Sequence, residues 1–405
     1  MSSVSICVMF PVLDAKLSGA LGVSYKVAKA VAESGLKLKI LDYKSGLLHK
    51  MLTDEGCCFD FIDLSLKGWD SYIDESDVVF GFNNDIYNYP FFFRNNPYVY
   101  FYDVYPPFWH RFLKPKGIGL IGSDKFLRSI SRRGFFDYAI SVMEAKSKYN
   151  IASRFPDASV ERVSVIPVSI RVDVNSFNFK LGDRIRVTYI GRSEAWKISP
   201  LAKLMKDVAI FGLKERVLFN VVVSDILFAK KLLKDEGVTI DSFNINFYEN
   251  ISKNDLSEVI RLNTDIGYAM GTAALEFGAH GVPTILADFS EKTFPDEYKY
   301  KWIFEVDGFT LGLDLSDCSN SERISQGVTI DKIIDRFINE PLVISKKCYA
   351  YVSEFHSEAS NYSKLVELIA SSRFKAFYLK SYQTFLFYFL QWVRKFILSK
   401  KKYER

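Results

Sequence analysis

Two groups of residues have the types and spacing needed to hold an anion. The first is the stretch from Gly191 to Lys197, which follows the apolar run 186–190. Arginine offers a fork of donors and lysine a compact charge, so Arg192 and Lys197 could together neutralise a diphosphate as it becomes a leaving group. We place this loop at the carboxyl end of a strand, which is where α/β sheets bind ligands. A solvated basic loop explains the same residues equally well.

The second group is a run of mostly small and apolar residues from Asp265 to Pro283. Met270, Gly271 and Thr272 stand where a strand gives way to a helix, and the N–H groups at a helix start suit a phosphate. Glu276 follows inside the expected helix, where a carboxylate is costly unless it accepts hydrogen bonds. A ribose with two adjacent hydroxyls would supply them, and so would a neighbouring loop that Glu276 caps.

Other catalytic signatures lack support. Gly117-Ile118-Gly119-Leu120-Ile121-Gly122 matches a dinucleotide-binding motif letter for letter, but it follows residues 112–116, which do not form a strand pattern. P-loop, zincin, serine-hydrolase and Asp-x-Asp motifs do not occur. The five cysteines form no C-x-x-C pair, which predicts a reducing compartment and no structural zinc. We therefore expect neither a metal nor a cofactor.

The elements that must position these residues read as two α/β series. The first begins with an apolar run at 4–10, a glycine-bearing turn at 18–22 and a helix at 25–34. It continues with strands at 38–41, 77–81, 98–101, 138–141 and 164–167. The second restarts the pattern with strands at 186–191, 218–223, 245–248, 264–268 and 283–287, and helices from 199 and at 226–234, 253–261 and 273–280. This predicts two doubly wound Rossmann-like domains, 1–172 and 173–345, followed by a terminal helix at 346–370 that packs back on the body.

Composition fits a multi-domain globular protein. The 405 residues are 48% hydrophobic and 25% charged, which excludes wholesale disorder and fibrous repeats. The net charge of +5 conceals a basic end, because residues 371–405 hold nine Lys and Arg against Glu404 alone. The remaining body is slightly acidic, which argues against nucleic-acid binding.

The tail, residues 371–405, has its own pattern. Apolar and aromatic residues recur at helical spacing from Phe374 to Ile397, and Lys400-Lys401-Lys402 follow. This predicts an amphipathic helix on an anionic bilayer, although a helix packed on the body or on a partner subunit has the same pattern. The longest uncharged run, 381–393, is too short to span a membrane. Because the N-terminus also lacks a basic signal region, we expect a cytoplasmic protein, peripheral on the inner face of the cytoplasmic membrane.

Taken together, the motifs resemble the retaining nucleotide-sugar glycosyltransferases of the twin-Rossmann (GT-B) type, the family 4-like group, over most of residues 1–370. Gly191-Arg192 with Lys197 matches the family's diphosphate clamp, and Leu275-Glu276 with Gly281-Val282-Pro283 matches its donor-ribose motif. Ser18 to Gly22 resembles the Gly-rich loop near the donor phosphates, which implies roles for Gly19 and Gly22. Residues 166–173 resemble the stretch between the domains.

The sequence also departs from this family. The family motif has two glutamates eight positions apart. Glu276 matches the second, but the position of the first is occupied by Tyr268. Either backbone groups of Met270 to Thr272 contact the donor sugar in its place, or the sugar contact differs. The N-domain histidine is replaced by Asp103, with His110 downstream. Asp103 could orient the acceptor hydroxyl or the transferred sugar, or it could cap the turn that follows.

The resemblance implies two domains that face each other across a cleft, the first for the acceptor and the second for the donor. It implies a metal-independent hexosyltransferase that moves a sugar from a nucleoside diphosphate to a lipid-linked or polysaccharide acceptor in bacterial surface glycan synthesis, such as O-antigen, capsule or lipopolysaccharide, with partner transferases. The residues expected to act are, for catalysis, Arg192, Lys197 and Asp103, and, for the donor, Gly19, Gly22, Gly191, Arg192, Lys197, Met270, Gly271, Thr272 and Glu276. A sugar-nucleotide 2-epimerase and a non-catalytic binding subunit of the same fold are the alternatives.

Overall fold

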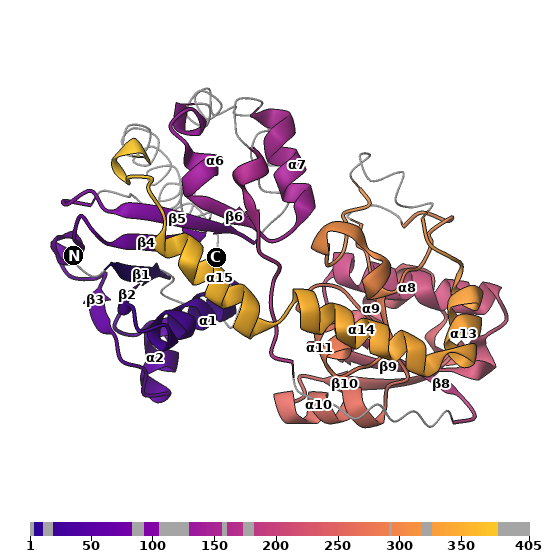
Figure 1. Ribbon diagram of the computed structural model, residues 1–405. Coiled ribbons are helices and arrows are strands. Elements are labelled where there is room, and N and C mark those ends of the chain that lie inside the picture. The colour runs from indigo at the N-terminus through magenta and orange to yellow at the C-terminus, as the bar shows by residue number, and fades with distance from the viewer. Residues whose placement is uncertain are drawn as a thin grey trace, which may run out of the picture. The chain divides into compact units, whose positions relative to one another are not determined.

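A computed structural model describes residues 4–10, 19–82, 93–104, 129–155, 160–172, 182–290, 294–316 and 326–379. The chain forms two compact units, one of Met1–Pro167 with Ala359–Arg405 and the other of Val168–Glu358. Each unit is built on its own parallel sheet with helices (Figure 1). The chain therefore passes between the units twice, at 167/168 and again at 358/359.

The first unit holds a seven-stranded sheet in the order β3-β2-β1-β4-β5-β6-β7. Every neighbouring pair is parallel. Its strands are β1 (Ser5–Met9), β2 (Lys37–Asp42), β3 (Asp60–Asp63), β4 (Val78–Phe82), β5 (Tyr98–Asp103), β6 (Ile140–Val142) and β7 (Ser164–Val165). Its helices are α1 (Gly19–Glu33), α2 (Leu47–Asp54), η1 (Trp69–Tyr72), α6 (Phe135–Tyr138), α7 (Ala145–Arg154), η2 (Val160–Arg162) and α15 (Glu358–Ala370).

Both faces of this sheet are buried, as expected for parallel strands whose crossovers are helical. Alternate residues of a strand enter different clusters: Ile6 and Val8 pack with α1 and α15 residues, whereas Cys7 packs with α6 residues such as Phe135. This explains why β1 reads as a continuous apolar run instead of an alternating one.

The second unit holds a five-stranded parallel sheet in the order β10-β9-β8-β11-β12. Its strands are β8 (Ile185–Ile190), β9 (Val217–Val223), β10 (Asn244–Glu249), β11 (Ile266–Ala269) and β12 (Thr284–Leu286). Its helices are α8 (Ala195–Ile210), η3 (Lys214–Arg216), α9 (Ile226–Asp235), η4 (Ile240–Ser242), α10 (Lys253–Leu262), α11 (Thr272–Ala279), η5 (Ile303–Glu305), η6 (Asp307–Phe309), α13 (Ile330–Asn339) and α14 (Pro341–Phe355). One hydrophobic cluster joins all five strands to these helices except η3 and η6.

Three helix predictions need correction. The helix expected from residue 25 begins at Gly19, so Gly22 lies inside α1 and not in a turn. The helix expected from residue 199 begins at Ala195. The expected helix at 346–370 is two helices, α14 and α15. The chain between them pairs with Ile170, which follows the first passage of the chain between the units. The Ile170 N–H donates to the His356 carbonyl, and the Glu358 N–H donates to the Ile170 carbonyl.

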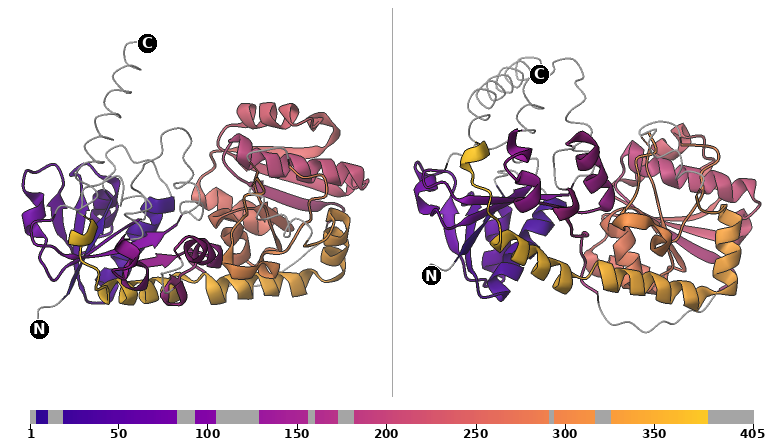
Figure 2. Two further views of the ribbon diagram at one scale, coloured as in Figure 1. Left: turned by 90° about the horizontal axis from the view of Figure 1, so that it is seen from above. Right: turned by 45° about the horizontal axis from the view of Figure 1, so that its top comes forward.

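The beginning of the predicted tail is part of the first unit. After α15 the chain runs beside the first sheet (Figure 2). There the Val99 N–H of β5 donates to the Phe374 carbonyl, and the Ala376 N–H donates to the Pro97 carbonyl. Phe374 and Leu379 are buried in the same cluster as Phe135. The apolar spacing that suggested a bilayer helix from 374 onward thus begins as core packing.

Several predictions fall outside the described residues: the Gly-rich motif at 117–122, Ser18, His110, Asp173, Cys318 and the tail from 380 to 405. Across the described ranges, no helix combines the length and the apolar character needed to cross a bilayer.

Candidate functional site

The candidate site lies at the carboxyl edge of the second unit's sheet. Because its strands are parallel, the loops after β8, β9, β11 and β12 all emerge at this edge. The loops after β8, β9 and β11 are short, and β11 reaches α11 through Met270 and Gly271 alone. Short connections between buried elements hold the loop residues in place.

The loop after β8 is fastened to the loop after β9 through Ser193. Its hydroxyl donates to the Asp225 carbonyl at 2.7 Å and accepts from the Asp225 N–H at 2.9 Å. The Ser193 N–H donates to the Ser224 hydroxyl at 3.0 Å. Gly191 must be glycine, because a Cβ there would lie 2.2 Å from the Tyr189 hydroxyl. The backbone of this loop is therefore fixed from both sides.

Arg192 and Lys197 lie near enough for their charges to interact, and their environments differ. The Arg192 side chain is 66% exposed and lies 3.1 Å from Glu194. Lys197 is partly buried, and its ammonium lies 4.3 Å from the centre of the Trp196 ring. Burial, together with the nearby Arg192 charge, lowers the pKa of Lys197 to about 8 against the opposing effect of Glu194. An anion between Arg192 and Lys197 would relieve the cost of holding two cations together.

Lys197 lies in the first turn of α8 and not in the loop. The sequence Ser199-Pro200 resembles a helix start, because proline is favoured at the first helical position. The helix instead begins one turn earlier, where the Lys197 and Ile198 N–H groups both donate to the Glu194 carbonyl at 2.9 Å. Two hydroxyls support this turn: Tyr189 donates to the Lys197 carbonyl and Tyr268 to the Pro200 carbonyl.

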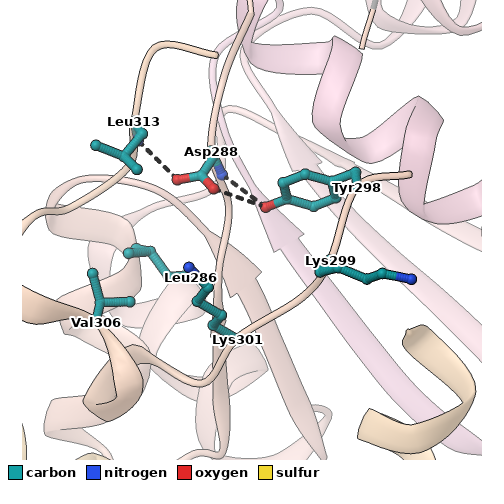
Figure 3. Close-up of a pocket in the computed structure, with 7 residues that line it drawn as sticks. All are labelled: Leu286, Asp288, Tyr298, Lys299, Lys301, Val306 and Leu313. Atoms are coloured by element: carbon teal, nitrogen blue, oxygen red, sulfur yellow. Dashed lines mark hydrogen bonds between the residues drawn. The ribbon is translucent and has the colours of Figure 1, made fainter. Parts of the chain in front are cut away.

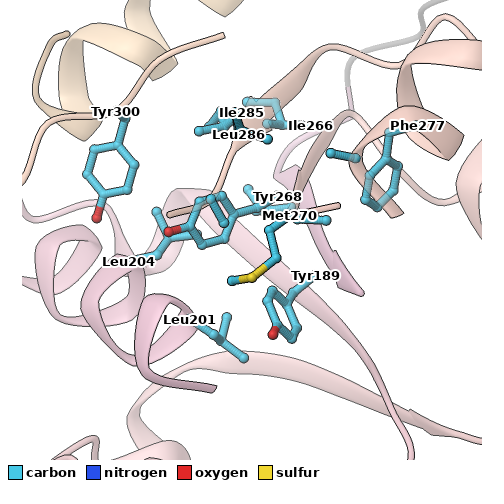
Figure 4. Packing of buried hydrophobic residues seen from close by; sticks show 14 of the residues in the cluster. Tyr189, Leu201, Leu204, Ile266, Tyr268, Met270, Phe277, Ile285, Leu286 and Tyr300 are labelled. Atoms are coloured by element: carbon cyan, nitrogen blue, oxygen red, sulfur yellow. The ribbon is translucent and has the colours of Figure 1, made fainter. Parts of the chain in front are cut away.

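Tyr268, where the resemblance would place a glutamate, is a core residue. It is fully buried in β11, and its ring lies 6.3 Å from that of Tyr189 and 6.2 Å from that of Tyr300 (Figure 4). Burial raises the pKa of its hydroxyl well above the usual range. Position 268 therefore supports α8 from within the sheet and is not available to a ligand.

The turn from Met270 to Thr272 opens toward the carboxyl edge. Gly271 has φ 65° and ψ −146°, a conformation open to glycine, and its N–H donates to the Leu311 carbonyl at 2.7 Å. That N–H is thus already used, and the helix-start donors for an anion are those of Thr272 and Ala273. Thr272 is exposed and Met270 is buried.

Most of the motif around Glu276 packs the helix in place. A Cβ on Gly267 would lie 2.3 Å from the Phe277 ring, and one on Gly278 would lie 2.6 Å from Val352 of α14. These glycines let α11 lie close to β11 and to α14. Glu276 is the ionisable side chain of this short helix and is partly exposed.

The loop after β12 adds an acidic residue that the sequence analysis missed. Asp288 accepts from the Leu313 N–H at 2.8 Å and from the Tyr298 hydroxyl at 3.2 Å, beside a small pocket that Lys299 and Lys301 also line (Figure 3). The next residue, Phe289, packs edge-on against Trp196 at 5.2 Å. A carboxylate directly after a buried strand was the signal that could have found it.

The residues predicted in the first unit lie at the carboxyl edge of the other sheet. Asp103 ends β5 and is fully buried, with its carbonyl accepting from the Met143 N–H. Gly19 begins α1, and a Cβ on Gly22 would meet nothing within 4 Å. Their roles remain predictions. Within the described ranges, no three His, Cys, Asp or Glu side chains gather as a metal site would require.

No protein-family model matches the sequence, and no curated protein matches it significantly. Solved structures do match. A glycosyltransferase from Rickettsia africae is 14% identical with a TM-score of 0.58, over 91% of this chain and 98% of that one. Anabaena HepE, solved with UDP and glucose, is 12% identical with a TM-score of 0.54, over 90% and 99%.

The lipopolysaccharide outer core galactosyltransferase WaaB is 10% identical with a TM-score of 0.56, over 90% of this chain and 98% of that chain. At these identities the likeness concerns the fold, and it extends over nearly the whole length of each protein. With two parallel-sheet units and these neighbours, the chain has the twin-Rossmann GT-B fold of known glycosyltransferases.

Proposed function

We propose that this protein is a glycosyltransferase that moves a sugar from a nucleoside diphosphate to a glycan acceptor. The observation that carries the proposal is the cation pair at the carboxyl edge of the second unit. Arg192 is largely exposed on a fixed loop, and Lys197 is held at a lowered pKa in the first turn of α8. Such a pair binds a diphosphate and is most useful as the bond to the sugar breaks and the charge on the leaving oxygen grows.

The other residues of this edge fit the rest of a donor. The N–H groups of Thr272 and Ala273 would bind phosphate oxygens at the start of α11. Glu276, on the same helix, would accept hydrogen bonds from the ribose hydroxyls. In this proposal the two side-chain cations stabilise the leaving diphosphate without a metal ion, so transfer is metal-independent. Retention of the anomeric configuration is proposed from the resemblance to retaining glycosyltransferases alone.

We further propose a lipid-linked acceptor in bacterial surface glycan synthesis and a place on the inner face of the cytoplasmic membrane. WaaB, named for lipopolysaccharide outer core synthesis, supports the first part by analogy. The basic, aromatic sequence of 380–405 supports the second.

A thermal-shift screen with UDP, GDP, CMP and ADP, each with and without magnesium, tests the donor site. A ligand that binds the native state raises its stability by mass action. We expect one nucleoside diphosphate to raise the melting temperature without magnesium, and Arg192→Ala to abolish the shift. Arg216→Ala is the matched control, since Arg216 is an exposed arginine in η3, before β9. An unchanged shift in Arg192→Ala would refute the site.

One observation keeps a non-catalytic binding protein as the second candidate. Position 268 is buried and the connection from β11 to α11 is two residues long, which leaves little chain to contact the transferred sugar. Incubation with the matching nucleotide sugar separates the two candidates. Transfer or release of the sugar supports the enzyme, binding without turnover supports the binding protein, and formation of an epimer would identify an isomerase.

A further inference from the structure

The amino-terminal edge of the first sheet carries a surface formed by segments far apart in the sequence. We define the amino-edge surface as the turn 132–134, α6, η2 and residues 372–379. α6 comes just before β6 and η2 just before β7, while residues 372–379 pair with the start of β5. All therefore lie at the end of the sheet opposite Asp103.

Side-chain contacts join these segments into one surface. The Ser372 hydroxyl donates to the Tyr138 carbonyl at 2.9 Å, and the Arg162 guanidinium lies 3.4 Å from the Tyr138 hydroxyl. The Arg133 guanidinium lies 4.9 Å from the centre of the Tyr378 ring. The Phe377 N–H donates to the Asn96 side chain at 2.8 Å, which fixes the segment just before residue 380.

The surface combines exposed arginines with exposed aromatic rings. Arg132, Arg133, Arg162 and Arg373 are exposed, whereas Lys375 is partly neutralised by Glu75 at 3.5 Å. Asp137 and Glu161 are the acidic residues within it, so the arginines prevail. Phe377 is 59% exposed and Tyr138 is 42% exposed. Two exposed aromatic rings therefore lie within one surface with four exposed arginines.

The sequence that leaves this surface has the same character. Residues 380–405 hold seven Lys and Arg against Glu404 alone, with many aromatic residues. Their starting point is fixed by the hydrogen bonds of 372–377 to β5 and the residues before it. The charge and aromatic content of the chain end therefore continue those of the folded surface.

We propose that the amino-edge surface binds the phosphate headgroups of an anionic bilayer, with Arg133, Arg162 and Arg373 on the phosphates and Phe377 in the interface. Arginine forms paired hydrogen bonds with phosphate oxygens, and aromatic rings favour the boundary between headgroups and acyl chains. This inference rests on the membrane association proposed above and not on sugar transfer. It assigns lipid contact to the folded unit as well as to the basic chain end.

Vesicle flotation of the full chain tests the proposal. The vesicles contain phosphatidylethanolamine and phosphatidylglycerol in equal parts, and neutral phosphatidylcholine vesicles serve as the blank. In R133Q/R162Q/R373Q we expect binding to fall about fivefold per arginine, or roughly 100-fold in all. The matched control is R216Q/K231Q/K234Q, which removes three exposed charges from the second unit and leaves binding unchanged.

A second variant distinguishes a bilayer from a soluble polyanion. Phe377→Ser is expected to weaken vesicle binding without changing retention on a heparin column, whereas Ile210→Ser, also a highly exposed position at 74%, changes neither. Wild-type vesicle binding by the arginine variant would overturn the proposal. So would equal losses on heparin and vesicles with no effect of Phe377→Ser, because the surface would then be a polyanion site. The thermal shift with nucleotide is measured on the same variants, so that failure of the donor site is seen separately.

Discussion

Two lysines, one in each unit, show how environment separates a structural cation from a functional one. Lys39 of β2 is buried and donates to Asp77 at 2.7 Å, to Asp74 at 2.9 Å and to the Tyr72 carbonyl. Burial alone would lower the pKa of Lys39, but the hydrogen bonds to Asp77 and Asp74 outweigh it and raise the pKa.

The pKa of Lys197 is instead lowered, to about 8. Among the described residues it has no carboxylate within ion-pair distance, and Arg192 adds a like charge. A lysine whose ammonium is already paired with carboxylates of the protein does not attract an anionic ligand. A lysine whose compensation is left incomplete is ready for an external anion, and this contrast can be tested from both sides.

The largest effect is expected from Lys39→Ala. It leaves Asp77 buried without its cation, which should lower the free energy of unfolding by about 3–5 kcal/mol. Urea unfolding measures this. Lys37→Ala on the same strand is the control, because its pair with Asp60 at 2.8 Å is more than half exposed and should contribute at most about 1 kcal/mol. Equal losses in the two variants would show that Lys39 is not the structural cation described above.

Lys197→Met should lower activity and not stability. Sugar transfer is expected to fall about 10²–10³-fold, because a charge that stabilises the leaving group is lost, while the free energy of unfolding stays the same or rises. Initial rates and urea unfolding on one preparation separate the two. Lys206→Met, on the same helix but at a partly exposed position paired with Glu236, should keep full activity. A destabilised Lys197→Met with normal rates would make Lys197 structural.

Glycines give a third test of the carboxyl edge. Gly271→Ala forces a side chain into φ 65° and ψ −146°, at a cost of about 1–3 kcal/mol, and should weaken nucleotide binding by moving the α11 start. Gly22→Ala introduces a methyl group into open space within α1 and should stabilise the protein by about 0.5–1 kcal/mol. Weakened nucleotide binding in a stabilised Gly22→Ala would support the predicted donor role of Gly22.

The pKa of Lys197, about 8, predicts a pH dependence. The ammonium form binds the diphosphate, so nucleotide affinity should fall about tenfold between pH 7 and pH 9 as the proton is lost. The free energy of unfolding should rise over the same pH range, because above pH 8 the unfolded chain keeps the Lys197 proton while the native protein loses it. Isothermal titration across this range measures the first effect. A curve of the same shape in Lys197→Met would assign the pH dependence to another group.

The smallest effect is expected from Tyr268→Phe. Removing the hydroxyl that donates to the Pro200 carbonyl should cost about 1 kcal/mol and leave the nucleotide dissociation constant unchanged. Thermal unfolding with and without nucleotide measures both. A marked loss of affinity would mean that position 268 acts on the ligand, as a glutamate there would.

Much of the fold could be predicted from local runs of apolar residues. The strands at the centre of each sheet are apolar on both faces, so β1, β8 and β9 are evident from their residues alone. β3 was not predicted, because an edge strand with the sequence Asp-Phe-Ile-Asp shows only two apolar residues. Arg192 and Lys197 could be proposed because a charged loop follows an apolar strand.

What could not be predicted depends on contacts between distant residues. The early start of α8 is supported by Tyr189 and Tyr268, and no local pattern around Pro200 reveals them. The use of the Gly271 N–H depends on Leu311, which is 40 residues away in the sequence. Phe374 has the same helical spacing whether it faces lipid or the core.

The fixed position of residues 372–377 at the start of β5 also bears on which acceptors the protein can use. β5 runs for six residues from Tyr98 to Asp103, so the backbone rises about 16 Å from the first to the last. If lipid headgroups meet the protein at the amino end of this strand and the strand runs along the membrane normal, an acceptor hydroxyl near its carboxyl end stands that far from the bilayer. A lipid bearing a single sugar falls short of such a height, and a glycan already several sugars long reaches it. The attachment of residues 372–377 at the amino end of β5 would thus set the minimum length of the glycan that the protein extends.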